Sequence, residues 1–246
     1  MARQTRIIEL PQLLAGVKLL VTAGPTHEYI DDVRFIGNPS TGRMGLEIAR
    51  IAQRMGAIVT CVCGPTHLSP PSGVRFVPVV SAEDLLAAVG ERFDDCNVFV
   101  ATAAVSDYRP EQRVPGKFKK GADKIELTLV RNPDVLAQMG KRRKPGQTVI
   151  GFSLEVDNAL DYARDKLERK NCDIMVVTTP AHFGDSREAV RVINAKGVLV
   201  EVPPSSKVEL AERICTLLSD MLKGKLPDLI SCFADKPKPV NGGSAA

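Results

Sequence analysis

The chain has 246 residues, of which 44% are hydrophobic and 25% charged, and its formal net charge is +4. This composition is typical of an ordinary soluble globular protein, and the charge is too weak and dispersed to indicate nucleic-acid binding by itself. No apolar run approaches the roughly 20 residues of a membrane span, and the first residues lack the apolar centre of a signal peptide, so we expect neither membrane insertion nor secretion.

Strand-like and helix-like segments alternate along the chain. Apolar runs predict strands at 17–22, 57–63, 75–79, 97–102, 147–152 and 173–178. Amphipathic segments predict helices at 43–55, 82–93, 133–140, 156–171 and 206–222. Ser81 and Ser206 each precede an acid by three residues, which is the capping-box pattern of a helix start, and Gly56 is placed to end the first helix. The alternation predicts an α/β fold, with a Rossmann-like, doubly wound, mostly parallel sheet and helices on both faces.

The loop between the first strand and the first helix is the most informative segment. Residues 21–45 read VTAGPTHEYIDDVRFIGNPSTGRMG, and their loop combines glycines at 37, 42 and 45 with hydroxyls at Ser40 and Thr41. A strand, a glycine-rich turn and a helix N-terminus together favour a phosphate group, because backbone N–H groups and the helix dipole attract an anion there. Neither standard motif is present, since Arg43 replaces the P-loop lysine and residues 23–26 lack the G-x-G-x-x-G pattern. A glycine-rich surface loop without a ligand is the alternative.

Small residues and then an acid follow the predicted strand at 97–102. The run reads Val98-Phe-Val-Ala-Thr-Ala-Ala-Val-Ser-Asp107. Ligands of open α/β sheets lie beyond the carboxyl ends of the strands, so Ala103 and Ala104 would leave room for one there. Asp107 could bind magnesium or a substrate hydroxyl, or it could merely cap a turn.

Two segments interrupt the alternation. Residues 109–130 begin as a basic stretch punctuated by glycine and proline and continue as the alternating run 124–130, which is typical of a mobile flap that returns along a strand. The flap lysines at 117, 119 and 120 could be a solvated surface, or they could close over a polyphosphate and stabilise developing charge. Residues 189–203 predict a hairpin that turns at 194–197. We expect residues 1–223 to form one domain and residues 224–246 a flexible C-terminal tail.

Lys166 and Lys170 are four residues apart and therefore share one face of the predicted helix at 156–171. With Phe152 at the end of the preceding strand, they could form a wall that stacks on a base and binds phosphate, or they could be an ordinary exposed face. Tyr162 and Lys166 also match the Y-x-x-x-K pair of short-chain dehydrogenases, but the glycine cluster and the serine that this family needs are missing.

Metal-binding patterns are weak in this sequence. Of its six cysteines, Cys61 and Cys63 share a strand face, but no second pair with metal-ligand spacing accompanies them, and there are only three histidines. We expect no protein metal site and interpret the cysteines as reduced packing residues of a cytoplasmic protein.

Taken in order, these motifs resemble one family, the phosphopantothenate–cysteine ligases (phosphopantothenoylcysteine synthetases) of the coenzyme A pathway. The matches run from about Val17 to Leu222. They are Thr-Ala-Gly-Pro-Thr-x-Glu-x-Ile-Asp, residues 33–45, residues 103–108, residues 117–120, residues 132–134, Gly151-Phe152, and the Lys166/Lys170 helix. In many bacteria this activity is fused behind a flavin-containing decarboxylase, so the resemblance implies a free-standing ligase or ligase domain without flavin.

The resemblance implies a two-step reaction. The carboxylate of 4′-phosphopantothenate is activated by a nucleoside triphosphate, usually CTP in bacterial enzymes, and the acyl-nucleotide then reacts with L-cysteine. Magnesium is implied as the companion of the triphosphate, held mostly by phosphate oxygens and water. Relatives often carry asparagines after the strand at 173–178 and near the end of the loop at 183–187, where this chain has none, so ATP stays open. A homodimer is implied, with no nucleic-acid or membrane partner.

The resemblance also implies roles for individual residues. The catalytic residues would be Asn38 and Lys117. The substrate-binding residues would be Arg34, Ser40, Gly42, Gly45, Ala103 and Ala104. The nucleotide-binding residues would be Ala101, Thr102, Ala103, Asp107, Lys117, Asn132, Pro133, Phe152, Lys166 and Lys170. An NAD(P)-dependent reductase of Rossmann type and a non-catalytic nucleotide-binding module are the alternatives.

Overall fold

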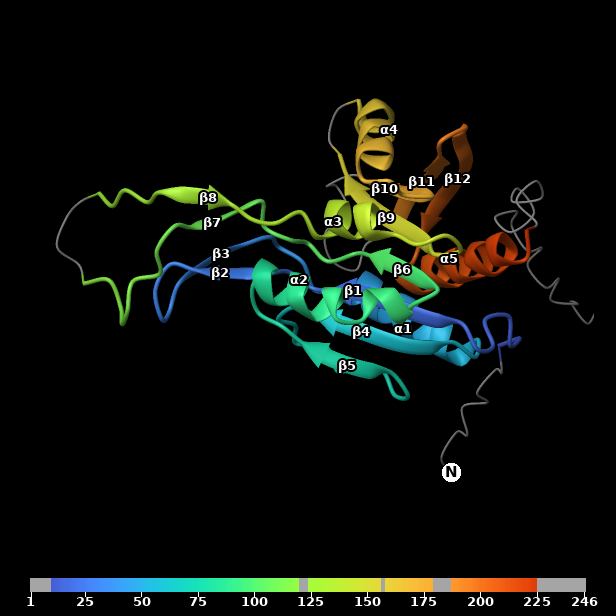
Figure 1. The fold of residues 1–246 in the computed structure, drawn as a ribbon, viewed down its shortest axis with the longest axis horizontal. Coiled ribbons are helices and arrows are strands. Elements are labelled where there is room, and N and C mark those ends of the chain that lie inside the picture. The colour runs from blue at the N-terminus through green and yellow to red at the C-terminus, as the bar shows by residue number, and fades with distance from the viewer. Residues whose placement is uncertain (1–9, 120–123, 156–157, 179–186, 225–246) are drawn as a thin grey trace, which may run out of the picture.

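The computed structural model describes residues 10–119, 124–155, 158–178 and 187–224, and an eight-stranded sheet forms its centre (Figure 1). From one edge to the other, its strands are β12 (Gly197–Ser205), β11 (Glu188–Asn194), β10 (Ile174–Thr178), β9 (Thr148–Leu154), β6 (Val98–Ala101), β1 (Lys18–Ala23), β4 (Ile58–Cys63) and β5 (Arg75–Pro78). The strands from β10 to β5 are parallel, whereas β11 and β12 are antiparallel and form the hairpin expected at 189–203.

The sheet is doubly wound from its centre. The chain runs from β1 outward to β4 and β5, returns to β6 on the other side of β1, and continues outward to β9 and β10. The parallel strands therefore have the 3-2-1-4-5-6 order of dinucleotide-binding sheets, which confirms the predicted fold class. The winding direction reverses between β1 and β6, and in such sheets ligands bind in the crevice beyond the carboxyl ends of these two strands.

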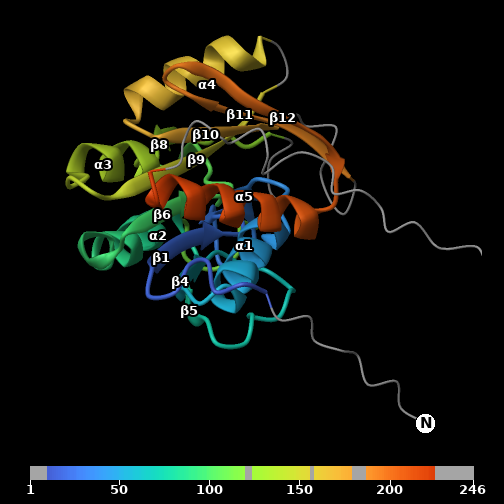
Figure 2. The ribbon, with the colours of Figure 1, turned by 90° about the vertical axis from the view of Figure 1, so that its right-hand side faces the viewer.

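Helices cover both faces of the sheet (Figure 2). Helices α1 (Arg43–Arg54) and α5 (Lys207–Leu222) pack on one face. Helices α2 (Ala82–Gly90), α3 (Val135–Arg142) and α4 (Ala159–Arg169) pack on the other. Strand β1 serves both layers because side chains alternate along a strand: Leu19 and Val21 join the first core and Leu20 the second. Each such buried aliphatic side chain stabilises the fold by about 1.5–3 kcal/mol.

Several helix boundaries differ from the expected ones for local reasons. Helix α2 ends at Gly90, short of residue 93, and is followed by a separate 3₁₀ turn, η1 (Phe93–Asp95). Helix α3 begins at Val135 rather than 133 because the Asp134 carboxylate accepts the Ala137 N–H at 3.0 Å as an N-cap. Helix α4 ends at Arg169 instead of 171 because Asn171 adopts the left-handed conformation, with φ of 50°.

A long arm projects from one end of the sheet (Figure 1). It contains two small antiparallel pairs, β2 (His27–Tyr29) with β3 (Phe35–Gly37), and β7 (Tyr108–Pro110) with β8 (Leu129–Arg131). We use the term arm for residues 27–37, 108–119 and 124–131. The sequence did not predict β2 and β3, and the strand expected over 124–130 forms only at β8.

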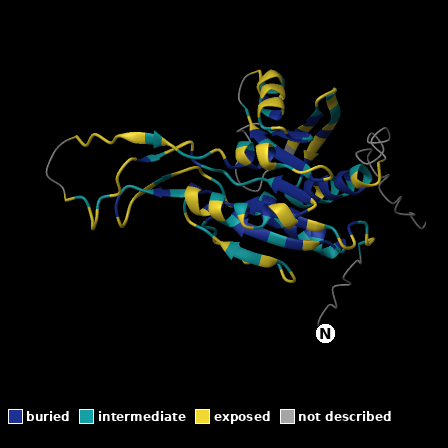
Figure 3. Cartoon of the chain, in the orientation of Figure 1, coloured by how far each residue is buried: buried dark blue, intermediate teal, exposed yellow. Residues whose placement is uncertain are grey.

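Burial follows this division (Figure 3): the sheet and the inner helix faces are buried, whereas much of the arm is exposed. No described helix is both long and apolar enough to span a membrane. The predicted C-terminal tail lies outside the described residues, as do residues 120–123, which include the flap lysine Lys120.

Candidate functional site

A cavity of about 640 Å³ opens at the carboxyl ends of the parallel strands, at the reversal point between β1 and β6. Its walls come from the ends of β1, β6 and β9, from Met175 of β10, from the loops that follow β6, from the start of α3 and from helix α4 with its C-cap Lys170. The predicted site residues that line it are Asn38, Ala101, Ala103, Ala104, Asp107, Asn132, Pro133, Phe152, Lys166 and Lys170. The sequence patterns therefore identified residues that come together from five separate segments.

The loop after β6 lines the cavity with residues 103–107 and is fixed by hydroxyls of the neighbouring Thr22 and Thr26. Thr22 Oγ1 accepts the Ala103 N–H at 3.2 Å, and Thr26 Oγ1 accepts the Ser106 N–H at 3.0 Å. In return, the Thr102 hydroxyl donates to the Thr22 carbonyl at 2.5 Å. These bonds give both threonines of the Thr-Ala-Gly-Pro-Thr motif a structural role, which is to hold the small-residue loop open and rigid.

Asn38 lies in the cavity wall with its amide oriented by the same loop. Its Nδ2 donates to the Val105 carbonyl at 3.0 Å and, more weakly, to the Ala104 carbonyl at 3.4 Å. Because both neighbours are carbonyl oxygens, the NH₂ group has to face them, and Oδ1 is left as the acceptor. The long bond to Ala104 is the one that a ligand carbonyl would most easily replace.

Asn132 also holds the loop after β6. Its Nδ2 donates to the Ser106 carbonyl at 2.9 Å, and its backbone N–H donates to the Asp107 carbonyl at 2.8 Å. The Asp107 side chain is exposed and lines the cavity. Within the described residues no three His, Cys, Asp or Glu side chains gather as metal ligands, so Asp107 could contribute to a cation site only together with oxygens from a ligand or water.

The two helix lysines line the cavity as predicted, but each is paired with a carboxylate. Lys166 Nζ binds Glu155, which also accepts the Ser153 hydroxyl, and Lys170 Nζ lies 3.1 Å from Asp134 Oδ2. An anionic ligand would therefore compete with these carboxylates. The sequence reasoning missed these pairings, and it also missed Arg131, which lines the cavity directly before the Asn-Pro-Asp motif.

Ser40, Gly42 and Gly45 do not line the cavity. Gly45 instead lets α1 approach β1, because a Cβ there would lie 2.6 Å from Ala23 Cβ and 2.8 Å from the Thr22 carbonyl oxygen. Gly42 adopts φ of 79° at the N-cap of α1, where its N–H is 3.3 Å from Ser40 Oγ. These contacts explain both glycines without a ligand, and phosphate binding by this segment stays a prediction.

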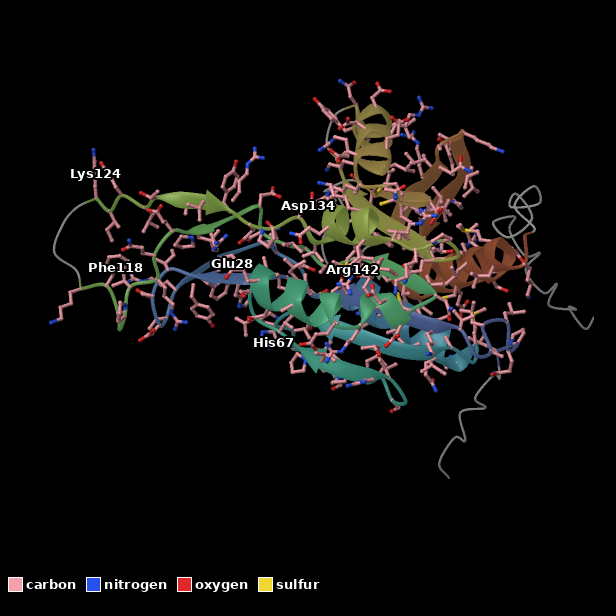
Figure 4. The ribbon with its side chains drawn as sticks, viewed as in Figure 1. Glu28, His67, Phe118, Lys124, Asp134 and Arg142 are labelled. Carbon is pink, nitrogen blue, oxygen red and sulfur yellow. The ribbon has the colours of Figure 1, made fainter. Side chains whose placement is uncertain are left out.

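Arg34 and Lys117 lie on the arm and do not line the cavity either. Arg34 forms an ion pair with Asp31, whose hydrogen bonds hold the pKa of that carboxyl well below its ordinary range. Figure 4 shows Phe118, the residue after Lys117, near the outer end of the arm and well separated from Asp134 at the cavity. Thr102, the remaining predicted residue, sends its hydroxyl to β1 instead of lining the cavity.

The Tyr162/Lys166 pair does not form a shared site. Tyr162 is 55% exposed and does not line the cavity, whereas Lys166 does. The described cysteines are all free thiols and are buried, which agrees with a packing role. The loop at 183–187, which bears on nucleotide choice, lies outside the described residues.

Comparison with known proteins gives consistent matches. A family model described as the DNA/pantothenate metabolism flavoprotein C-terminal domain matches residues 14–222. The chain is 40% identical over 230 residues to the coenzyme A biosynthesis bifunctional protein CoaBC of Mycolicibacterium smegmatis, covering 88% of this chain and 56% of that protein. It is 38% identical over 203 residues to the CoaBC protein of Haemophilus influenzae, covering 81% and 50%. The chain thus spans about half the length of these curated relatives.

Solved structures agree with the fold. A crystal structure of the C-terminal domain of a CoaBC protein shares 37% identity with a TM-score of 0.74, covering 87% of this chain and 99% of that one. A Cab2 mutant in complex with phosphopantothenate-cysteine shares 19% identity with a TM-score of 0.68, covering 85% and 88%, and at that identity it supports the fold alone.

Proposed function

Because the chain belongs to the family of the DNA/pantothenate metabolism flavoprotein C-terminal domain, we propose that it ligates 4′-phosphopantothenate to L-cysteine in coenzyme A biosynthesis. One observation carries the proposal beyond family membership. The cavity at the reversal point of the sheet gathers Asn38, the alanine loop after β6 and the lysine face of α4, which are the segments expected to bind an acyl-nucleotide.

The proposed reaction has two steps. In the first, a carboxylate oxygen of 4′-phosphopantothenate attacks the α-phosphorus of CTP or ATP, the bond to the β-phosphate oxygen breaks, and pyrophosphate leaves. In the second, the cysteine amine attacks the acyl carbon, a C–N bond forms, and the nucleoside monophosphate leaves with the former acyl oxygen. The amine loses a proton to solvent. No covalent bond to the protein is needed, so the protein's task is to position the reactants and offset charge.

We assign the nucleotide to the side of the cavity formed by Phe152 and α4. Phe152 offers an aromatic face for the base, and Lys166 and Lys170 offer charge for phosphates once these displace Glu155 and Asp134. Ala103 and Ala104 leave space for the reacting groups. Phosphate binding by Ser40, Gly42 and Gly45 stays a prediction, because contacts within the protein already account for these residues.

Asn38 is proposed to orient the acyl carbonyl for attack by the amine. Its anchoring to Val105 fixes the side chain, and the weak 3.4 Å bond to Ala104 can be exchanged for one to the ligand. Lys117 is proposed to offset charge on the α-phosphate during activation. We propose that magnesium accompanies the triphosphate and neutralises part of its charge, with Asp107 as the available protein carboxylate. No flavin takes part in this scheme.

We also propose that the protein is a homodimer in which the arm forms the contact. The arm exposes large apolar side chains, including Val33 (57% exposed), Phe35 (45%), Ile125 (54%) and Leu129 (43%). Several large apolar side chains exposed on one projecting element are the kind of surface that a protein partner can cover. Arg34 and Lys117 lie on this arm, away from the cavity of the same chain. To contact substrate, the arm must either bend toward that cavity or reach the cavity of a second copy of the protein.

The deciding experiment is an assay of pyrophosphate release. Purified protein is incubated with magnesium, 4′-phosphopantothenate and either CTP or ATP, with and without cysteine. We expect release that depends on 4′-phosphopantothenate, amide product that depends on cysteine, and a preference between the nucleotides. Nucleotide binding without release would instead favour the non-catalytic module, and saturable NAD(P)H binding that Tyr162→Phe abolishes would favour the reductase.

A further inference from the structure

The turn between β2 and β3 carries two consecutive aspartates, and the first is buried although it lies on a thin arm. The Asp31 side chain is 0% exposed. Its Oδ1 accepts the backbone N–H groups of Val33 at 2.8 Å and Arg34 at 2.7 Å, which closes the turn. Its Oδ2 accepts the Arg34 guanidinium and, from a segment 87 residues away, the Phe118 N–H at 3.1 Å. One carboxylate therefore joins the turn to the flap.

The second aspartate binds the same flap two residues earlier. Asp32 Oδ2 accepts the Gly116 N–H at 2.8 Å, and the Asp32 N–H donates to the Gly116 carbonyl at 2.9 Å. Asp32 Oδ1 also forms an ion pair with Arg113 at 2.8 Å. Gly116 has φ of 76°, which allows the flap backbone to turn toward these groups.

The residue enclosed by these contacts is Lys117. The backbone N–H groups of both its neighbours, Gly116 and Phe118, are bound by the aspartates. Arg34 adds to the clamp by donating to the Phe118 carbonyl at 3.3 Å and lying over its ring at 5.5 Å. The Lys117 ammonium has no ion pair with the part of the chain that the structure describes. Its backbone is thus fixed, while its charged end is available.

We propose that Asp31 and Asp32 are positioning residues that hold Lys117 for the activation step, so that turn, Arg34 and flap lysine act as one unit. This proposal rests on the ligase function proposed above. It differs from the expectation of a mobile flap, because the described part of the flap is docked on the β2–β3 turn through side chain-to-backbone bonds as well as backbone bonds.

The chemistry of the Asp31 site supplies a selective substitution. In Asp31→Asn the amide oxygen can keep the Oδ1 bonds to Val33 and Arg34, so the turn can still close. The amide NH₂ then takes the place of Oδ2 and faces only donors, the Phe118 N–H and the Arg34 guanidinium. The substitution therefore releases the flap while changing almost no volume.

The first readout is amide hydrogen exchange of the flap in the full chain, measured by NMR without ligands. We expect the Phe118 amide, which loses its acceptor, to exchange about tenfold faster in Asp31→Asn, the factor that loss of a typical hydrogen bond allows. Asp32→Ala, at a side chain that is 53% exposed, should act chiefly on Gly116 and guards against a misfolded Asp31 variant. Asp94→Asn is the matched control, because it removes another ion-paired aspartate, beside Arg142 and far from the arm.

The second readout separates positioning from general stability. In the pyrophosphate-release assay, Asp31→Asn should lower kcat about 100-fold, as expected for a misplaced catalytic group, with a much smaller change in the KM for the nucleotide. Lys117→Gln should cause a similar loss. The double variant should be little worse than Lys117→Gln alone, because Asp31 acts through Lys117.

The possible results distinguish this proposal from the function on which it rests. Unchanged flap exchange in both aspartate variants would overturn the clamp, whatever the activity. Faster exchange with an unchanged kcat, or losses that add fully in the double variant, would overturn the positioning role and leave the ligase function intact. No pyrophosphate release by the wild-type protein with either nucleotide would overturn the function, and the positioning role with it, while the exchange data would still decide whether the aspartates dock the flap.

Discussion

At the residue scale, Gly45 is a position where either of two causes would require glycine: close packing of α1 on β1, or close approach of a phosphate ligand. A methyl group there would meet Thr102 Oγ1 as well as the atoms of β1, so α1 would have to move outward. We expect Gly45→Ala to lower the free energy of unfolding by about 1–3 kcal/mol, as overpacking usually does, in urea denaturation.

The control for this prediction is Gly90→Ala in α2. A Cβ at Gly90 would meet nothing closer than Arg142 at 3.6 Å, and its φ is not positive, so stability should hold or rise slightly. If Gly45→Ala were as stable as the wild type and yet bound 4′-phosphopantothenate poorly, the phosphate-binding interpretation of this segment would gain support over the packing interpretation.

Asn38 and Lys117 are expected to serve different steps. Asn38→Asp places a carboxylate against the Val105 and Ala104 carbonyls, so it should slow amide formation from the acyl-nucleotide about 100-fold while affecting pyrophosphate release less. Lys117→Gln should suppress pyrophosphate release itself. Rapid-quench measurement of the acyl-nucleotide checks this, and equal loss of both steps in both variants would contradict it.

The sequence predicted individual cavity-lining residues better than it predicted the side chains with which they form ion pairs. Lys166 and Lys170 follow from helical spacing, and Asn38 from its motif, because these signals are local. The carboxylates that hold the lysines come from β9's end and from the N-cap of α3, and no pattern within α4 indicates them. Side-chain pairs between distant segments depend on how the elements pack. The periodicity of a single sequence reports local structure only, so it does not reveal these pairs.

At the scale of elements, long apolar strands and capped helices were predictable and the arm was not. Strands β2 and β3 have only three residues each, too few for an alternation to stand out from a loop. Glu28 shows what anchors them instead: it is buried and accepts the Ala82 N–H at 3.0 Å, which joins the arm to the start of α2. This long-range hydrogen bond fixes the position of the β2–β3 hairpin against α2, and the local propensities of the hairpin residues cannot predict it.

The capping box of α5 makes a testable contribution that depends on pH. Glu209 accepts the Ser206 N–H at 2.7 Å, and this backbone bond lowers the pKa of Glu209. A carboxylate whose pKa is lower in the folded state adds stability above its unfolded pKa of about 4.3 and loses it as the pH falls through the folded value.

We therefore expect Glu209→Gln to cost about 0.3–1 kcal/mol at pH 7, the usual range for an acid in the first turn of a helix. The cost should shrink toward zero as the pH falls through the lowered pKa that Glu209 has in the folded state. Thermal melts across this pH range, with the exposed Glu168→Gln of α4 as control, measure the difference. A constant cost at all pH values would show that charge is not involved.

At the scale of the whole molecule, the alternation of strand and helix was enough to predict a doubly wound sheet, because right-handed crossovers leave few other arrangements. The position of the cavity followed from that topology. The projecting arm did not, since its exposed apolar residues resemble any short hydrophobic run until the fold shows that nothing described covers them.

The proposed homodimer can be tested through these residues. Phe35→Asp puts a charge among the exposed apolar side chains of the arm and should shift the protein toward monomer in sedimentation velocity. Ile58→Asp alters another exposed apolar residue, at the other end of the sheet and 62% exposed against 45% for Phe35, and should leave the assembly unchanged. Identical sedimentation of the wild type and the Phe35→Asp variant would remove the arm as the contact.

The paired lysines of the cavity have one more consequence. Lys166 and Lys170 already hold Glu155 and Asp134, so in the proposed assignment a nucleotide would replace one set of counterions by another and would not fill a bare positive site. A triphosphate would bring more negative charge to these two lysines than the monophosphate left after amide formation, so the monophosphate would be the poorer competitor. The internal carboxylates would then help to expel the spent nucleotide, and the cavity would return to the next cycle already neutralised.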